Sequence, residues 1–147
     1  MKKFTLALIA HDRQKDEMVN LVMAHREELE VIKLVATHGT GQMITNRLHI
    51  PVALLKSGPE GGDLQIGAMI TNRDVDAVIF LRDPLTAHPR EPDVSALLRI
   101  CDVHNIPLAT NVATAEALLH LLFDHPEALS GHHLIAGYLE NIASTHN

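Results

Sequence analysis

The chain has 147 residues, of which 46% are hydrophobic and 20% charged; this suits one domain of ordinary size, because two domains would each have too little hydrophobic core. The formal net charge is −6 and the basic residues are scattered, which excludes the concentrated positive surface of a nucleic-acid-binding protein. Cys101 is the only cysteine, so a disulfide framework and multi-cysteine metal sites are excluded, and a reducing cytoplasm is favoured.

The first residues combine two lysines with an apolar run, as secretion signals do. The run Phe4–Ala10 has only seven residues, however, and ends in His11, Asp12 and Arg13, where a signal would have small residues for cleavage. No apolar stretch elsewhere approaches the roughly 18 residues of a membrane-spanning helix. We therefore expect a cytoplasmic protein with no membrane partner.

Short apolar runs alternate with longer segments of helical periodicity along the chain. This alternation is typical of an α/β fold, with a doubly wound, mostly parallel sheet of about five strands and helices on both faces. We expect a single domain over residues 1–147. In chain order, the pattern predicts a strand at Phe4–Ala10, a helix at Lys15–His25, a strand at Val31–Ala36, a helix at Gly41–Leu48, a strand at Val52–Leu55 and a helix at Leu64–Thr71. A strand at Val75–Leu81, a helix at Asp93–His104, a strand at Ile106–Ala109 and a helix at Ala113–Asp124 follow. The chain then ends in a C-terminal helical tail at 126–147, with its helix at His133–Ile142.

Ligands of such a sheet bind beyond the carboxyl ends of the strands. The segment Thr37-His38-Gly39-Thr40-Gly41 follows the second predicted strand and offers hydroxyl and amide donors at the start of a helix, which suits a phosphate. It matches neither a Walker A nor a dinucleotide motif, so no nucleotide cofactor is implied. A plain turn in which Thr40 caps the helix explains this segment equally well.

The segment from Ser57 to Asp63 holds three glycines and a proline, which a mere connection does not need. We expect its backbone to approach another group closely. Asp63 stands where a helix starts, so its carboxylate either caps that helix or faces the ligand cleft. After the fourth strand, Asp83 and Asp93 bracket a stretch stiffened by three prolines, and Asp93 also suits the first turn of a helix.

The chain holds eleven histidines, but their spacing fits no metal motif, so we expect no metal. His11 stands out because it follows the first strand directly, where an imidazole can reach a ligand. Together the strand ends offer a phosphate cradle, carboxylates, a histidine and a lysine. That set suits acid–base chemistry on a small phosphorylated metabolite.

Six motifs recur in order from about Thr5 to about Asp124: Ala10-His11-Asp12, Ala36-Thr37, Ser57-Gly58-Pro59 with Gly61-Gly62-Asp63, Asp83-Pro84-Leu85, Glu91-Pro92-Asp93, and Ile106-Pro107-Leu108-Ala109-Thr110-Asn111. In these motifs the chain resembles methylglyoxal synthase. The resemblance implies a cofactor-free lyase that converts dihydroxyacetone phosphate to methylglyoxal and inorganic phosphate, usually as a homohexamer.

The resemblance also implies roles for individual residues. Asp63 falls on the general base and Asp93 on a second carboxylate needed for the chemistry. The substrate- and phosphate-binding positions are His11, Lys15, Thr37, Thr40, Ser57 and Gly58.

The chain departs from the family pattern in two places. Arg90 replaces a histidine thought to polarise the carbonyl and relay protons, with His88 nearby, and arginine keeps its proton at neutral pH. In the cradle, His38 and Gly39 replace a glycine and a threonine; the Gly39 amide still suits phosphate, and the His38 imidazole adds a donor. The loss of the histidine leaves open a non-catalytic module that binds a phosphorylated ligand, and an isomerase making glyceraldehyde phosphate is a third possibility.

Overall fold

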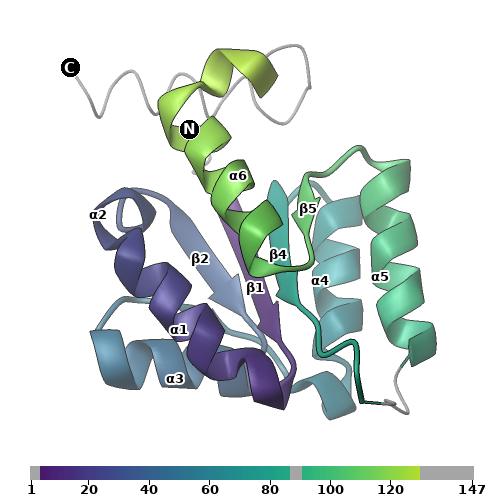
Figure 1. Ribbon diagram of the computed structural model, residues 1–147. Helices are drawn as coiled ribbons and strands as arrows, with labels where there is room; N and C mark the ends of the chain where they lie inside the picture. Colours follow the sequence, from purple (N-terminus) through teal and green to yellow (C-terminus); the bar gives the residue numbers. More distant parts are fainter. Residues whose placement is uncertain (1–3, 87–90, 130–147) are drawn as a thin grey trace.

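The computed structural model describes residues 4–86 and 91–129 and contains a five-stranded sheet (Figure 1). The strand order is β3-β2-β1-β4-β5, and each neighbouring pair is parallel. The strands are β1 (Thr5–Ala10), β2 (Lys33–Ala36), β3 (Ala53–Leu54), β4 (Ala77–Leu81) and β5 (Leu108–Ala109). The helices are α1 (Lys15–Ala24), α2 (Arg26–Leu29), α3 (His38–Leu48), α4 (Gly62–Thr71), α5 (Glu91–Val103) and α6 (Val112–Asp124). Single 3-10 turns lie at Asp12–Gln14, Gly58–Glu60 and Pro126–Leu129.

The central strand β1 is apolar on both sides because helices cover both faces of the sheet. All six of its residues are buried, and its register pairs Ala7 with Val35 of β2 and with Val78 of β4. A strand that is buried on both faces reads as a continuous apolar run, which is what made Phe4–Ala10 recognisable in the sequence.

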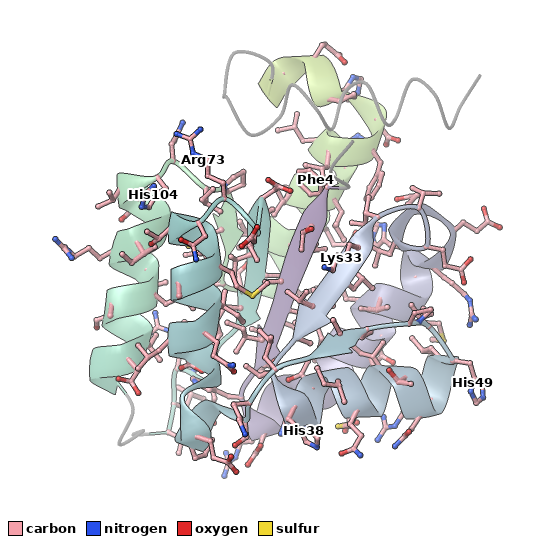
Figure 2. All side chains as sticks on the ribbon, turned by 180° about the vertical axis from the view of Figure 1, so that it is seen from behind. Phe4, Lys33, His38, His49, Arg73 and His104 are labelled. Atoms are coloured by element: carbon pink, nitrogen blue, oxygen red, sulfur yellow. The ribbon has the colours of Figure 1, made fainter. Side chains whose placement is uncertain are left out.

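Two hydrophobic cores lie on opposite faces of the sheet. On one face α1, α3 and α6 pack against Leu6, Leu8 and Ala10 of β1. On the other face α4 and α5 pack against Ala7 and Ile9. This arrangement confirms the predicted doubly wound α/β fold. Figure 2 shows Phe4 and Arg73 at one end of the sheet and His38 at the other, where β2 ends.

The elements differ from the predicted ones mainly at their ends. The four strands after β1 are shorter than their apolar runs, since residues such as Val31, Val75 and Ile106 approach the sheet without pairing as strand. The short helix α2 is not in the prediction, and α3 starts three residues earlier than Gly41. The predicted helix His133–Ile142 lies outside the described residues. Among the described helices, none has the length and apolar character needed to cross a lipid bilayer.

Cys101 lies inside the core between α5 and the sheet. Its side chain is buried with 0% exposure. Burial, together with the neighbouring charge of Asp102, raises the pKa of its thiol to about 12. The thiolate is the reactive form of cysteine, so this residue packs as a small apolar side chain and is inert at neutral pH.

His25 joins the α1–α2 corner to α6. Its Nε2 lies 2.7 Å from Glu116 of α6 and its Nδ1 lies 3.3 Å from Glu28. Burial lowers the pKa of His25, but the hydrogen bonds and charges of Glu116 and Glu28 outweigh that effect and raise the pKa above 6.5. The protonated ring, which donates from both nitrogens, is therefore the form that the fold favours.

We expect a His25→Gln variant to lose stability that depends on pH. Because the folded-state pKa is raised, this contribution is fully present below pH 6.5 and disappears as pH rises through the folded-state pKa. Urea unfolding should show the variant less stable than the wild type by about 1 kcal/mol at low pH, with a smaller difference at high pH. Combining the change with Glu116→Gln should add less than the two single effects. A difference independent of pH would contradict this account.

Candidate functional site

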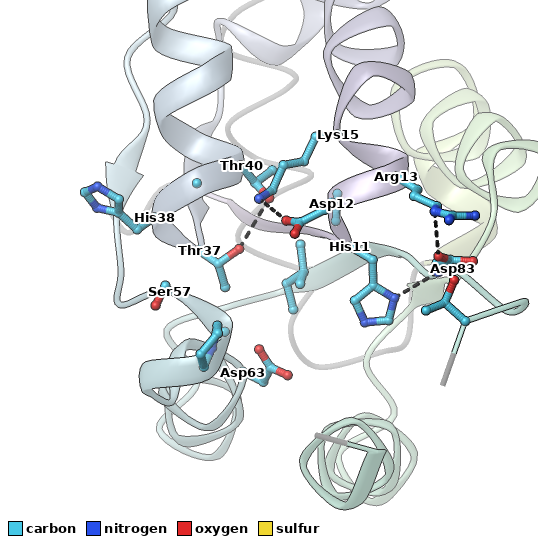
Figure 3. A pocket seen from close by; sticks show the side chains of 16 residues that line it. His11, Asp12, Arg13, Lys15, Thr37, His38, Thr40, Ser57, Asp63 and Asp83 are labelled. Carbon is cyan, nitrogen blue, oxygen red and sulfur yellow. Dashed lines mark hydrogen bonds and ion pairs between the residues drawn. The ribbon is translucent and has the colours of Figure 1, made fainter. Parts of the chain in front are cut away.

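A polar cavity of about 400 Å³ opens at the carboxyl ends of the strands. The strand order reverses between β1 and β4, and the cavity lies at this switch point, as expected for a doubly wound sheet (Figure 3). It is lined by segments that follow β1, β2, β3 and β4. Its described lining residues are Ile9, Ala10, His11, Asp12, Arg13, Lys15, Thr37, His38, Gly39, Thr40, Ser57, Gly58, Pro59, Asp63, Asp83 and Thr86.

The predicted phosphate loop forms the first turn of α3. Thr37 occupies the N-cap position and α3 starts at His38, so Thr40 is the third helical residue and does not cap the helix. Gly41 lets α3 pack closely against the sheet, because a Cβ there would lie 2.4 Å from Leu54 of β3 and 3.1 Å from Ala36 of β2. The early amides of a helix have no partner within the helix and suit an anion. The turn presents the Gly39 and Thr40 amides beside the Thr37 hydroxyl, which donates to Thr40 Oγ1 at 3.4 Å.

Lys15, the first residue of α1, carries its ammonium to this turn. The Nζ atom lies 2.6 Å from Asp12 Oδ1, and a Cβ on Gly39 would lie only 2.8 Å from Nζ. Gly39 therefore leaves the space in which the ammonium sits. Because Asp12 is 95% exposed, solvent screens its pairing with Lys15 and the ammonium remains able to meet an anion in the cavity.

The glycine-rich segment brings Asp63 into the cavity. Gly61 has a φ of 97°, and a Cβ on Gly62 would lie 2.1 Å from the Lys56 carbonyl oxygen. This confirms the predicted close approach of the backbone. The N-cap position of α4 is Gly61, so Asp63 lies in the first turn without capping the helix. Its side chain is 1% exposed and lines the cavity, as expected for a functional carboxylate.

His11 is fixed in one tautomer by a backbone contact. The Asp83 amide donates to its Nδ1 at 2.9 Å, so the proton of the neutral ring lies on Nε2. The ring is 4% exposed and packs edge-on against Phe80, with 5.2 Å between ring centroids. His11 is thus a held hydrogen-bond donor in the cavity wall.

Arg13 and Asp83 also line the cavity, although no role is predicted for them from the sequence. Arg13 Nε lies 3.9 Å from Asp83 Oδ2, and the Arg13 side chain is 75% exposed whereas that of Asp83 is 7% exposed. Asp83 lies two residues after the end of β4, so the rule that strand ends converge is the signal that points to it.

The cavity unites most of the predicted site residues. The predicted residues that line it are His11, Lys15, Thr37, Gly39, Thr40, Ser57, Gly58 and Asp63. His38 also lines it, but at the outer rim, with its exposed ring turned away from His11 in Figure 3. Asp93 is half-buried in the first turn of α5 and is not among the described lining residues. His88 and Arg90 lie outside the described residues.

The cavity combines a buried carboxylate with several hydrogen-bond donors and an ammonium group. Asp63 is positioned to accept a proton, His11 to donate a hydrogen bond, and the start of α3 with Lys15 to hold an anionic group. Within residues 4–86 and 91–129, no cluster of three or more histidine, cysteine or acidic side chains could hold a metal ion. The described groups are those of acid–base chemistry on an anionic substrate.

Comparison with known proteins points to one enzyme family. A family model described as the MGS-like domain matches residues 17–110. The chain is 55% identical over 121 residues to the methylglyoxal synthase of Moorella thermoacetica, covering 82% of this chain and 94% of that protein. It is 58% identical over 114 residues to that of Lysinibacillus sphaericus, covering 78% and 85%. The crystal structure of the methylglyoxal synthase of Elizabethkingia anophelis matches with a TM-score of 0.75 and 45% identity, over 80% of this chain and 77% of that one.

Proposed function

We propose a mechanism in which Asp63 is the base, and its premise is that this chain belongs to the methylglyoxal synthase family. The enzyme converts dihydroxyacetone phosphate to methylglyoxal and inorganic phosphate. One observation carries the assignment of the base: the Asp63 carboxylate is buried in the cavity wall, and phosphate donors line the same cavity. The lyase is favoured over the non-catalytic binding module because the relatives described above are named as synthases.

In the first step Asp63 takes a proton from the carbon that bears the substrate hydroxyl. A positioned general base contributes roughly 10²- to 10⁴-fold in rate. The electrons move toward the carbonyl oxygen, where a donor must meet the developing charge. We assign this donor role to His11, because the Asp83 amide donates to its Nδ1 and the proton of the neutral ring therefore lies on Nε2.

In the second step the enediolate expels phosphate. The C–O bond to phosphate must stand out of the enediolate plane for elimination, so the grip on the phosphate selects this outcome. Several groups that line the same cavity support that grip: the Gly39 and Thr40 amides, the Thr37 and Ser57 hydroxyls, the Lys15 ammonium, and Gly58.

The remaining catalytic roles stay predictions from the family resemblance. We propose Asp93 as the second carboxylate, and Arg90 or His88 as the group that faces the carbonyl oxygen. The position of Asp93 in the first turn of α5, directly after the segment that carries His88 and Arg90, supports this assignment. Arginine stabilises an oxyanion but does not relay protons at neutral pH, so an Arg90→His change should raise turnover if the relay limits it.

A product assay tests the function directly. Purified protein is incubated with dihydroxyacetone phosphate, and methylglyoxal, inorganic phosphate and glyceraldehyde phosphate are measured separately. We expect equal amounts of methylglyoxal and phosphate. Glyceraldehyde phosphate as the main product would indicate an isomerase, and binding of the substrate without any product would indicate the non-catalytic module.

Gly39 offers a test of the phosphate grip. In a Gly39→Ala variant the new Cβ displaces the Lys15 ammonium, which is the end of a flexible side chain, so the fold should tolerate the change. We expect KM for dihydroxyacetone phosphate to rise roughly tenfold, which corresponds to about 1.4 kcal/mol. Gly39→Thr adds a hydroxyl to the cradle and should recover part of that loss. An unchanged KM in the Gly39→Ala variant would contradict a role of Lys15 in holding the phosphate. Gly67→Ala serves as the control, because no atom lies within 4 Å of the new Cβ there.

We further propose that the protein acts in the cytoplasm as a homohexamer, in one domain over residues 1–147 whose tail at 126–147 contributes a helix. The family resemblance supports the homohexamer, and the single cysteine suits the cytoplasm. The two hydrophobic cores that share one sheet support the single domain. Light scattering of the purified protein measures the mass of the assembly.

A further inference from the structure

The reaction produces a reactive compound beside an exposed arginine. Methylglyoxal carries an aldehyde next to a ketone, and such α-dicarbonyl compounds condense with the two nitrogens of a guanidino group. Arg13 lines the cavity, and its side chain is 75% exposed, so it extends from the cavity wall to solvent (Figure 3). Product that leaves the cavity on this side passes the guanidinium.

We propose that Arg13 is a site of covalent modification by the α-dicarbonyl product, formed during turnover. This inference rests on the proposed function, because the reagent is the product of that reaction. Production of the reagent inside the cavity gives Arg13 a far higher effective concentration than bulk solution gives other arginines.

The contacts of Arg13 distinguish it from other arginines of the fold. Arg47 pairs with Asp16 at 2.8 Å and Arg26 pairs with Glu30 at 3.0 Å, and neither lines the cavity. The contact of Arg13 Nε with Asp83 is longer, at 3.9 Å, and Asp83 lines the same cavity as Arg13. Arg73 is exposed as well, but it lies at the opposite end of the molecule from His38 and the cavity rim (Figure 2).

The chemistry needs no partner besides the product. The guanidinium gives one proton to water, and the freed nitrogen lone pair attacks the aldehyde carbon, whose carbonyl electron pair moves to oxygen and takes up a proton. A second nitrogen adds to the ketone carbon in the same way and transfers its proton to that oxygen. Two C–N bonds form, two carbonyl groups become hydroxyl groups, and no electrons are gained or lost. Departure of one water then gives the dehydrated ring.

The experiment compares two arginines under turnover. Wild-type enzyme converts dihydroxyacetone phosphate in an excess of a small thiol, which captures methylglyoxal that reaches bulk solution, while phosphate release records turnover. Peptides from a protease that does not cleave at arginine are then weighed for the gain of one methylglyoxal, with or without the loss of one water. We expect the modified fraction of Arg13 to exceed that of Arg73 about tenfold.

A second arm uses the same protein without substrate or thiol and with methylglyoxal added directly. Both arginines then meet the reagent from solution, so the ratio of Arg13 to Arg73 adduct should fall well below its value under turnover. Arg13→Lys should abolish the ring adduct in its peptide, whereas Arg73→Lys should leave the Arg13 adduct in place. Phosphate release with equal modification of Arg13 and Arg73 would overturn this inference alone. Absence of phosphate release would overturn the proposed function and this inference with it.

Discussion

An Asp63→Asn enzyme should form methylglyoxal and phosphate roughly 10²- to 10⁴-fold more slowly than the wild type, because a carboxamide does not accept the substrate proton. The amide is close in size to the carboxylate and stays in the first turn of α4, where its backbone position is set by Gly61 and Gly62. The loss should therefore appear in kcat more than in KM, since the phosphate donors are unchanged. Initial rates of product formation measure both constants.

The matched control for this change is Asp16→Asn. Asp16 is also an early helical aspartate, in α1, but it is 76% exposed and pairs with Arg47 at the surface, away from the cavity. Its variant should keep the wild-type rate, because exposed ion pairs contribute little. Binding of inorganic phosphate to the Asp63→Asn protein should persist and shows that the site is intact. A fully active Asp63→Asn enzyme would contradict the role of this carboxylate as the base.

Much of the cavity could be predicted because it rests on one rule of the fold. Side chains that follow the strands of a parallel sheet converge at one edge, so His11, Thr37, Ser57 and Asp63 were recognisable from their places after apolar runs. The unusual glycine content of the segment before Asp63 added a second signal, and Gly62 shows its cause in the approach to the Lys56 carbonyl.

Features that depend on long-range contacts could not be predicted in the same way. The tautomer of His11 is set by the amide of Asp83, which is 72 positions away in the chain. The start of α3 was predicted too late because the intrinsic helix propensities of threonine and glycine are low. The close packing of Gly41 against Leu54 and Ala36 is likewise a tertiary contact that the local pattern does not show.

A Gly62→Ala substitution should destabilise the protein strongly and reduce its activity. The added Cβ would lie 2.1 Å from the Lys56 carbonyl oxygen and 2.9 Å from Thr37 Cγ2, and neither backbone nor a buried threonine yields easily. Such overpacking costs about 1–3 kcal/mol. In a domain of this size the unfolding midpoint falls by roughly 2–4 °C for each kcal/mol. Because the Lys56 carbonyl accepts the His38 amide at 3.4 Å, its displacement also disturbs the first turn of α3 and hence the phosphate cradle.

Alanine substitutions at two other glycines, Gly61 and Gly67, distinguish a loss of stability caused by the close contact at Gly62 from a general intolerance of alanine. Gly61 has open space for a Cβ but a φ of 97°, so Gly61→Ala should cost about 1 kcal/mol through backbone strain alone. Gly67, in the interior of α4, has neither constraint, and Gly67→Ala should stabilise the protein by about 0.5–1 kcal/mol through helix propensity. Thermal unfolding of the three variants should therefore rank Gly67→Ala above the wild type, Gly61→Ala below it and Gly62→Ala lowest. If Gly62→Ala were as stable as Gly67→Ala, the close approach of α4 to the Lys56 carbonyl would not be what fixes Asp63 in the cavity.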